Sequence, residues 1–407
     1  MLFNCESKLI IIMVGLPARG KSYTAHKILR YFKWIGYTTK IFNVGDMRRN
    51  ILGGFQNASF FDHNNKIYSD IRDNIAYDVM NKLITWLKEK NNNIGIFDAT
   101  NSTIKRRKNL YNTCIQNNFT PIFIENICTD KRLITDNLKM KLTSPDYKNI
   151  SENDAKKDFF LRLNNYAKVY ETVNFEEELP FVKIINNNTH TQVININGLL
   201  EKEILCFLLH LKINKYPIYL TRHGESQYNT FGKLGGDSSL SEFGKLYKDK
   251  LNEYIINENQ SNIKIYTSTL KRTIETSEKL SNNYNILNYK ILDEINAGIC
   301  DGMTYDEVKE KYPEIHKKRK EDKFNFRYPI GESYRDIIER IKPFILEIES
   351  LEKPILIICH NAICRVIYSY LLNLPQEEIP FFDIPLHTVI KLTPNANSYT
   401  EMRYKLL

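Results

Sequence analysis

Two short motifs contain residue types that handle phosphate groups, one in each half of the sequence. Residues 15–22 read Gly-Leu-Pro-Ala-Arg-Gly-Lys-Ser. A glycine-rich loop with this spacing offers backbone N–H groups to phosphates, and its lysine and serine serve the β/γ phosphates and Mg²⁺. Residues 222–225 read Arg-His-Gly-Glu, and a histidine nitrogen can attack phosphorus to form a phosphohistidine. The first motif indicates phosphoryl transfer from a nucleotide, and the second indicates phosphate removal.

A carboxylate belongs near the first motif. Asp98 ends the apolar run at residues 94–97 and is followed by Ala-Thr-Asn. Ligands of α/β sheets bind at the carboxyl edge, where this residue would lie. Alone, a strand-terminal Asp is more often a turn or helix cap. Beside a phosphate loop, Asp98 and Ser22 are instead the predicted Mg²⁺ ligands.

Phosphate removal needs positive charge around the transferred group. His223 is the predicted nucleophile. Arg222, Arg272 and the strand-terminal His360 are the residues that would supply this charge.

The departing oxygen also needs an acid. Glu294 is the candidate, because a carboxylate near phosphate gains proton affinity. Its neighbour Asp293 is an alternative on residue type alone.

Alternating apolar runs and helical patterns predict the elements that position these residues. Strands separated by helices favour parallel sheets covered on both faces. The predicted strands are 8–14, 38–44, 94–97, 121–127, 217–221, 262–267, 289–293, 354–359 and 388–393. The predicted helices are 21–34, 66–89, a helix after 103, 131–141, 152–172, 199–211, 239–256, 269–280, 331–350 and 361–373.

Length and composition support two domains. A chain of 407 residues exceeds what one hydrophobic core usually organises. The segment before Pro217 predicts a boundary that separates domains 1–213 and 214–407, both of α/β type. The net charge of +9 admits anionic partners, but the lysines are scattered, so small phosphorylated substrates are favoured over nucleic acid.

Cysteine use and hydropathy indicate a cytoplasmic protein without membrane contact. Seven cysteines include no Cys-x-x-Cys pair and read as reduced thiols. The apolar run at 9–14 is too short for a signal peptide core or a membrane span.

Four segments of the N-terminal half carry a resemblance to a known family. They are the loop 15–22, Phe-Asn-Val-Gly-Asp-Met-Arg-Arg at 42–49, Phe-Asp-Ala-Thr-Asn at 97–101 and Ser-Pro-Asp-Tyr at 144–147. Together with the phosphatase motifs that follow in order, they resemble the bifunctional 6-phosphofructo-2-kinase/fructose-2,6-bisphosphatase family. The resemblance implies a P-loop kinase domain followed by a histidine-phosphatase domain of the phosphoglycerate-mutase type. It also implies ATP and Mg²⁺ for the kinase half, no cofactor for the phosphatase half, and a homodimer.

The resemblance also assigns residues to each kinase subsite. The nucleotide would contact Gly15, Leu16, Pro17, Ala18, Arg19, Gly20, Lys21, Ser22, Asn137 and Lys141. Fructose 6-phosphate would contact Arg48, Arg72, Thr100, Arg106, Arg162 and Tyr166. Lys21, Asp98 and Cys128 would be catalytic, although an inert buried thiol is an equally good interpretation of Cys128. Without the resemblance, helical arginines such as Arg72 and Arg162 would be read as a solvated face.

The phosphatase half is assigned in the same way. The catalytic set would be Arg222, His223, Asn229, Glu294 and His360. Fructose 2,6-bisphosphate would contact Arg222, Asn229, Gly235, Arg272, Tyr305, Arg319, Lys323, Tyr334, Asn361 and Arg365.

Four residues at three sites depart from the family pattern. Asp46-Met47 replaces Glu-Tyr, Asn296 replaces Asp, and Asn361 replaces Gln. The shorter Asn361 predicts a weaker or water-bridged sugar contact, and the change at 46–47 predicts looser sugar binding. Few residues precede the loop or follow the last strand, so control through the long terminal extensions of animal members is not expected.

Two other functions remain open from the residues. A nucleic-acid end-healing kinase/phosphatase would also combine a phosphate loop with a phosphatase, and it predicts basic and aromatic tracks with salt-sensitive binding of single strands. A catalytically silent metabolite sensor is disfavoured, because every expected chemical residue is present.

Overall fold

The computed structural model describes residues 8–142, 145–148, 150–260, 262–395 and 398–407. The chain divides into two compact units, an N-terminal unit ending at Leu211 and a C-terminal unit beginning at Lys212. The boundary predicted after residue 213 lies two residues further along the chain. Cys5 and Ser144 lie outside the described residues.

The N-terminal unit contains a six-stranded sheet in the order β2-β3-β1-β4-β5-β6. All neighbouring pairs are parallel except β5 and β6. β1 lies inside the sheet and is buried along its length, which explains its unbroken apolar sequence. The strands are β1 (Leu9–Val14), β2 (Thr39–Asn43), β3 (Ile94–Asp98), β4 (Thr120–Ile127), β5 (Phe181–Ile185) and β6 (His190–Ile194).

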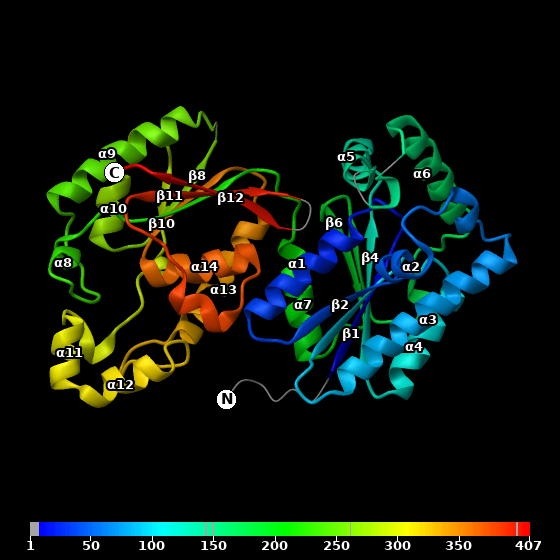
Figure 1. Cartoon of the computed structure of the whole chain (residues 1–407), viewed down its shortest axis with the longest axis horizontal. Coiled ribbons are helices and arrows are strands. Elements are labelled where there is room, and N and C mark those ends of the chain that lie inside the picture. The colour runs from blue at the N-terminus through cyan, green and yellow to red at the C-terminus, as the bar shows by residue number, and fades with distance from the viewer. Residues whose placement is uncertain (1–7, 143–144, 149, 261, 396–397) are drawn as a thin grey trace. The chain divides into compact units, whose positions relative to one another are not determined.

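Helices cover both faces of this sheet. Figure 1 shows α1 and α7 on one face and α3 and α4 on the other. Ile10 and Ile12 of β1 share a core with Leu83 and Leu87 of α3. The helices are α1 (Lys21–Trp34), α2 (Val44–Leu52), α3 (Lys66–Lys88), α4 (Ile104–Gln116), α5 (Lys131–Leu142), α6 (Glu152–Ala167) and α7 (Leu199–His210), with short 3-10 helices η1 (Ala58–Phe61), η2 (Pro145–Tyr147) and η3 (Phe175–Glu177).

One predicted helix of this unit is too long. The prediction of 152–172 is wrong beyond residue 167, where α6 ends. Residues 170–174 belong to no helix, and Tyr170 and Thr172 donate hydrogen bonds to the buried Glu125 of β4 instead.

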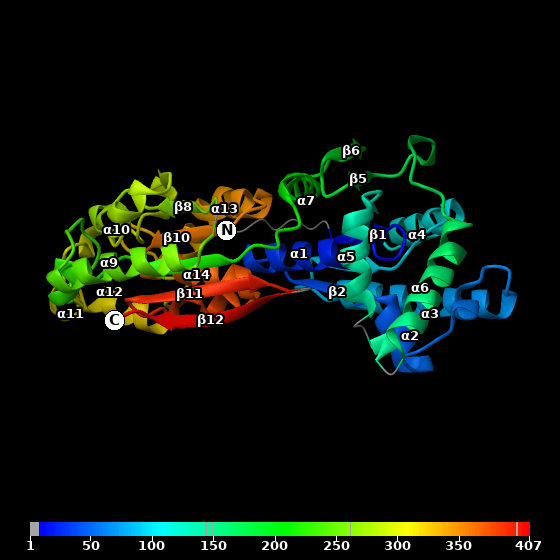
Figure 2. The ribbon, with the colours of Figure 1, turned by 90° about the horizontal axis from the view of Figure 1, so that it is seen from above.

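The C-terminal unit contains a second six-stranded sheet in the order β12-β11-β7-β10-β8-β9. β7, β10, β8 and β9 are parallel, whereas β11 and β12 run antiparallel at one edge, where Figure 2 shows them side by side. The strands are β7 (Ile218–Arg222), β8 (Lys264–Thr267), β9 (Ile286–Asn288), β10 (Ile355–Cys359), β11 (Thr388–Pro394) and β12 (Tyr399–Lys405).

This sheet also has helices on both faces, so the predicted fold class of two α/β domains is confirmed. α9 and α10 lie on one face, and α13 and α14 lie on the other (Figure 1). The helices are α8 (Gln227–Thr230), α9 (Glu242–Asn257), α10 (Lys271–Ser277), α11 (Tyr305–Lys311), α12 (Pro313–Glu321), α13 (Tyr334–Ser350) and α14 (Asn361–Leu372). Within the described ranges, no helix combines the length and hydropathy needed to cross a membrane.

The strand predicted at 289–293 is wrong. Strand β9 ends at Asn288, and residues 290–292 form a 3-10 helix. The chain turns there because the Tyr289 N–H donates to Thr267 and the Asp293 carboxylate accepts hydrogen bonds from Thr269.

Candidate active sites

The loop 15–22 joins the carboxyl end of β1 to the first residue of α1. A Cβ at Gly15, whose φ is +135°, would lie 2.6 Å from the carbonyl oxygen of Asn126, so glycine is required there. Gly20 is the left-handed N-cap of α1. The loop therefore wraps the N-terminus of a 14-residue helix, where unpaired N–H groups favour anions.

Ser22 and Asp98 meet at this loop. The Ser22 hydroxyl donates to Asp98 Oδ2 at 2.8 Å, and Asn43 Nδ2 donates to the same oxygen at 2.6 Å. A hydroxyl and a carboxylate are oxygen ligands suited to Mg²⁺, which keeps several waters and phosphate oxygens of its own. In the described part of the chain no cluster of three or more His, Cys, Asp or Glu forms a complete metal cage. The two residues thus fit a metal that arrives with phosphate.

Lys21 is buried in the loop and donates to the Leu16 carbonyl at 2.7 Å. Desolvation lowers the pKa of Lys21 to about 7, although Asp98 acts in the opposite direction. The ammonium is therefore held by a carbonyl dipole in a site where phosphate oxygens would restore its usual pKa.

Two other predicted nucleotide-site residues and the predicted catalytic residue Cys128 lie around the loop. Asn137 Nδ2 donates to the Ala18 carbonyl at 3.1 Å. Lys141 is exposed at the end of α5, yet desolvation lowers its pKa and Asp98 opposes that change. Cys128 is buried, and burial raises the pKa of its thiol, so the group stays protonated near neutral pH.

Asp146 of η2 gathers two predicted sugar-site arginines. Arg48 Nη2 donates to Asp146 Oδ1 at 2.6 Å, and Arg162 Nη1 donates to Oδ2 at 3.1 Å. Arg49 adds a third contact at 3.2 Å. Burial alone would raise the pKa of Asp146, but Arg48 and Arg162 hold it below its usual range. Sequence reasoning quoted Asp146 only as part of a motif and did not identify this role.

Phe61 of η1 supports the same arginines. The guanidinium carbons of Arg48 and Arg162 lie 5.4 and 3.8 Å from its ring centroid. The ring of Tyr166 lies 5.9 Å away, centroid to centroid. Arg48 Nε and Nη1 and Arg162 Nε are buried without a hydrogen-bond partner among the described residues. These nitrogens are donors available to a bound anion.

Arg106 and Arg72 complete the predicted sugar site. Arg106 Nε donates to Asn101 Oδ1 at 3.0 Å, and Nη1 donates to Asp73 at 2.7 Å. Arg72 donates to the Phe60 carbonyl. Both arginines interact electrostatically with each other.

The backbone links this group to the nucleotide loop. The Thr100 carbonyl accepts the Gly15 N–H at 3.1 Å. At the divergent position Asp46, the exposed carboxylate accepts a hydrogen bond from Arg49.

In the C-terminal unit, β7 ends at Arg222 and delivers His223. His223 Nδ1 lies 2.6 Å from the Gly224 carbonyl, and Arg272 Nε donates to His223 Nε2 at 3.1 Å. The ring therefore carries its proton on Nδ1 and has its lone pair on Nε2. Desolvation, Arg272 and Arg222 lower the pKa of His223 well below 6.5. The imidazole is neutral, as a nucleophile must be.

His360 lies beside His223, with ring centroids 5.1 Å apart. This proximity follows from the sheet, because β10 pairs with β7 and Cys359 is in register with Arg222. His360 Nε2 lies 2.7 Å from Ser268 Oγ, and Nδ1 has no partner among the described residues. Desolvation and Arg272 lower the pKa of His360 well below 6.5.

A cavity of about 260 Å³ opens in front of His223. Apart from the adjacent His360, every residue that the sequence assigned to this site lines it. They are Arg222, His223, Asn229, Gly235, Arg272, Glu294, Tyr305, Arg319, Lys323, Tyr334, Asn361 and Arg365. Lys233, Tyr228, Phe326 and Tyr328 also line it and were missed. Only the closeness of Lys233 to Gly235 in the sequence hinted at its position.

Backbone carbonyls, not carboxylates, hold four of the cations of this cavity. Arg222 donates to Ile384, Arg272 to Gly236, Lys323 to Pro380 and Arg365 to Phe382, at distances of 2.7 to 3.1 Å. None of them, nor Arg319, forms an ion pair with a described carboxylate. Burial, followed by Arg365 and Arg319, lowers the pKa of Lys323 to about 8.

Glu294 is the carboxylate that lines the cavity. Its Oε1 accepts the N–H of Ile295 at 2.9 Å and that of Ala362 at 3.2 Å. The alternative, Asp293, does not line the cavity, and its carboxylate accepts hydrogen bonds from the N–H and hydroxyl of Thr269.

The remaining polar residues are fixed around it. Asn229 Oδ1 accepts two hydrogen bonds from Ser226 at 3.0 Å, Tyr305 accepts from Arg319 at 3.0 Å, and Tyr334 accepts from Arg365 at 3.2 Å. Gly235 has φ +63°, and a Cβ there would lie 1.6 Å from Asp301 Oδ1. The divergent Asn361 has a buried Oδ1 without a partner among the described residues.

Comparison with known proteins identifies both units. Residues 2–215 match the family described as 6-phosphofructo-2-kinase, and residues 218–406 match the histidine phosphatase superfamily (branch 1). The chain is 43% identical over 397 residues to fructose-2,6-bisphosphatase of Saccharomyces cerevisiae, covering 96% of this chain and 87% of the relative.

Two animal relatives carry both activities in their names. The chain is 38% identical to 6-phosphofructo-2-kinase/fructose-2,6-bisphosphatase 3 of Rattus norvegicus, covering 96% of this chain and 71% of the relative. It is 39% identical to 6-phosphofructo-2-kinase/fructose-2,6-bisphosphatase of Caenorhabditis elegans, covering 95% of this chain and 86% of the relative. These matches span both units, and the chain therefore belongs to the bifunctional 6-phosphofructo-2-kinase/fructose-2,6-bisphosphatase family.

Proposed function

We propose that this chain makes and removes fructose 2,6-bisphosphate and thereby controls glycolysis and gluconeogenesis. The N-terminal unit transfers the γ-phosphoryl group of ATP to the 2-hydroxyl of fructose 6-phosphate, and the C-terminal unit hydrolyses the product. Family membership supports this proposal. The observation that carries it is that each unit has its own phosphate-handling centre, Ser22–Asp98 in one and neutral His223 beside Arg272 in the other.

Synthesis needs positioning and charge neutralisation more than covalent chemistry. Ser22 and Asp98 would hold Mg²⁺, which neutralises charge on the transferred phosphoryl group when bound. Lys21 binds the outer phosphates, and burial keeps water away from it. The unpartnered nitrogens of Arg48 and Arg162 bind the sugar phosphate. The protonated thiol of Cys128 supplies no nucleophile to this step.

Hydrolysis proceeds in two steps. His223 Nε2 attacks phosphorus, the bond from phosphorus to the sugar 2-oxygen breaks, and Glu294 gives its proton to that oxygen. Water then attacks the phosphohistidine, Glu294 takes a proton from the water, and the phosphorus–nitrogen bond breaks. Arg222 and Arg272 stabilise the charge on the transferred group in both steps. His360 is neutral in the free site, and its unpartnered Nδ1 is available for a hydrogen bond to that group rather than for the positive charge expected from the sequence.

The proposal includes a homodimer, located in the cytoplasm, that binds no nucleic acid. Light scattering would test the dimer, and filter binding to single-stranded RNA would test the absence of nucleic-acid binding. An end-healing enzyme is the weaker candidate, since the chain matches a sugar-phosphate family over both units.

Two variants test the separation of the activities. With ATP, Mg²⁺ and fructose 6-phosphate, Lys21→Met is expected to abolish bisphosphate synthesis and to retain hydrolysis. His223→Ala is expected to abolish hydrolysis while synthesis remains. Fructose 2,6-bisphosphate labelled at its 2-phosphate is also expected to transfer no label to this variant. The exposed Lys33→Met and His190→Ala are matched controls. Loss of both activities in either folded variant would contradict two independent sites.

A further inference from the structure

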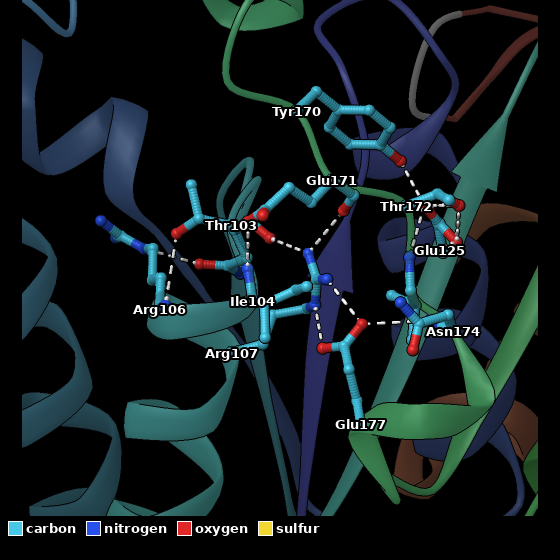
Figure 3. A network of polar contacts seen from close by, with 12 residues as sticks. Thr103, Ile104, Arg106, Arg107, Glu125, Tyr170, Glu171, Thr172, Asn174 and Glu177 are labelled. Atoms are coloured by element: carbon cyan, nitrogen blue, oxygen red, sulfur yellow. Dashed lines mark hydrogen bonds and ion pairs between the residues drawn. The ribbon is translucent and has the colours of Figure 1, made fainter.

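Residues 168–177, which we call the strap, follow α6 in the connection to the strand β5. α6 carries Arg162 and Tyr166, so the strap begins where sugar-site residues end. Figure 3 shows polar contacts from two directions converging on it, from α4 and from β4.

Arg107 is the centre of the contacts from α4. Its side chain is fully buried, and Nε and Nη2 donate to the two oxygens of Glu177 at 2.8 and 2.7 Å. Nη1 donates to the carbonyls of Glu171 and Asn101 at 2.8 and 3.3 Å. One side chain therefore fixes both ends of the strap and the loop after β3.

Asn101 is the link from Arg107 to the site. This buried residue has φ +43°, a conformation that needs support from its neighbours. Its Nδ2 donates to the Met13 carbonyl in β1 at 2.7 Å, and its Oδ1 accepts Arg106 Nε at 3.0 Å. Asn101 thus joins the strand before the nucleotide loop to a predicted sugar-binding arginine.

Glu171 fixes the first turn of α4, which carries Arg106. Its N–H donates to the Ser102 carbonyl at 2.8 Å, and its carboxylate accepts the Ile104 N–H at 2.8 Å. Figure 3 shows Arg107 directed at Glu171 and Glu177 while Arg106 points the other way along the helix.

Glu125 holds the strap from the β4 side. Its carboxylate is fully buried and accepts hydrogen bonds from Tyr170 and Thr172, with Lys183 Nζ 3.4 Å away. Glu125 is in register with Val14, the residue before the nucleotide loop. The strap is therefore tied to both substrate regions.

We propose that Arg107, held by Glu177, is a positioning residue for phosphoryl transfer. It sets Asn101 and the first turn of α4, and through them it places Arg106 relative to the nucleotide loop. Arg107 is too buried to touch a substrate, so it acts through Asn101 and Arg106. The inference rests on the proposed function of the N-terminal unit.

A purely structural role makes a different prediction. Removing one partner of a buried ion pair destabilises a protein strongly, whereas replacing both partners by apolar groups is often neutral. The double variant Arg107→Met/Glu177→Leu therefore removes the positioning contacts and keeps the fold.

The experiment measures synthesis kinetics of the full-length double variant. We expect kcat/KM for fructose 6-phosphate to fall about 100-fold, because a small misplacement at a reacting centre can lower the rate by that factor. The affinity for nucleotide and the rate of bisphosphate hydrolysis are expected to stay within about twofold of the wild type, and the unfolding temperature is expected to change little. Lys108→Met, at the exposed neighbouring position, is the matched control. Arg107→Lys is the second variant if the double variant fails to fold. It keeps charge opposite Glu177 but loses the carbonyl contacts, and we expect a fall of about tenfold.

A coupling test identifies the route of action. If Arg107 acts through Arg106, adding Arg106→Met to the double variant lowers kcat/KM no further than Arg106→Met alone. Additive losses would overturn the proposal, as would unchanged fructose 6-phosphate kinetics in the double variant or in Arg107→Lys. A wild-type protein that makes no bisphosphate would instead refute the proposed function, and this inference with it.

Discussion

The two units hold their buried cations in different ways. In the N-terminal unit arginines pair with carboxylates, as Arg48 does with Asp146 and Arg107 with Glu177. In the cavity of the C-terminal unit the cations donate to backbone carbonyls, as Arg222 does to Ile384. A carbonyl fixes the geometry of a cation without cancelling its charge.

This difference follows from the tasks proposed for the two units. The phosphatase cavity must stabilise charge on a transferred group and also bind a second phosphate, so uncancelled cations favour the ligand. Burial, followed by the same crowding of cations, lowers the pKa of His223 and Lys323. In the kinase unit the ion pairs maintain the architecture, and the nitrogens of Arg48 and Arg162 that have no partner among the described residues are available to a bound phosphate. Removing one partner of a buried ion pair in the kinase unit should therefore affect mainly stability. Removing a carbonyl-held cation from the phosphatase cavity should affect mainly catalysis.

The largest effect is expected from Arg272→Met. It removes the guanidinium that donates to His223 Nε2 and faces the transferred group. Loss of one such donor costs about 10²–10³ in rate, so kcat/KM for hydrolysis should fall by about 10³. Thermal unfolding should change little, because relief of like-charge crowding offsets lost packing. The exposed Lys271→Met is the control, and a large drop in the unfolding temperature would contradict the comparison.

Asp146→Asn tests the opposite arrangement in the N-terminal unit. It leaves Arg48 and Arg162 without their buried counter-charge, and we expect the free energy of unfolding to fall by about 3 kcal/mol. Both tryptophans, Trp34 and Trp86, lie in this unit, so their fluorescence in urea follows it selectively. The exposed Glu152→Gln is the control. Equal unfolding curves for the two variants would show that these ion pairs do not support the fold.

The sequence predicted the parts of these sites that lie at the ends of strands. His223 and His360 follow two apolar runs, and apolar strands of one parallel sheet deliver their ends to one edge. The positions of the loop 15–22 and Asp98 could be predicted for the same reason, because each follows or ends an apolar strand. Local patterns suffice where a strand sets the position.

Contacts between distant, irregular segments were not predictable in this way. Arg107 and Glu177 are 70 positions apart, and Arg48 and Asp146 are 98 apart. A lone acid in a turn has no periodicity that identifies its partner. Residues 168–172 of the strap were predicted as helix, because the helical pattern before them continues. The buried Glu125, which accepts hydrogen bonds from Tyr170 and Thr172, lies elsewhere in the chain.

Lys21 tests the comparison within one unit, because it lies in the N-terminal unit, where arginines pair with carboxylates, yet it donates to a backbone carbonyl. Its pKa is lowered to about 7, so the ammonium is charged below pH 7 and largely neutral above it before nucleotide binds. Bound phosphates raise that pKa, and binding above pH 7 must take up a proton. Affinity for ATP with Mg²⁺ should therefore fall about tenfold from pH 7.5 to 8.5.

Calorimetry in buffers of different ionisation enthalpy measures this proton uptake directly. Lys21→Arg, whose guanidinium stays charged, should bind without uptake and with little pH dependence. Uptake that persists in Lys21→Arg would assign the proton to another group.

The smallest expected effect is that of salt, and one ligand can report on both units. Fructose 6-phosphate is the proposed substrate of synthesis and the proposed product of hydrolysis. Its KM for synthesis reports on the N-terminal unit and its inhibition constant for hydrolysis reports on the C-terminal unit, so the same ligand charge probes both sites. Salt screens uncancelled cations more than cations already paired with carboxylates. Between 50 and 250 mM NaCl we expect the inhibition constant for hydrolysis to rise about fivefold and the KM for synthesis to rise less than twofold. Equal rises would mean that carbonyl-held and carboxylate-held cations present the same field to a phosphate, and the distinction between the units would then concern folding alone.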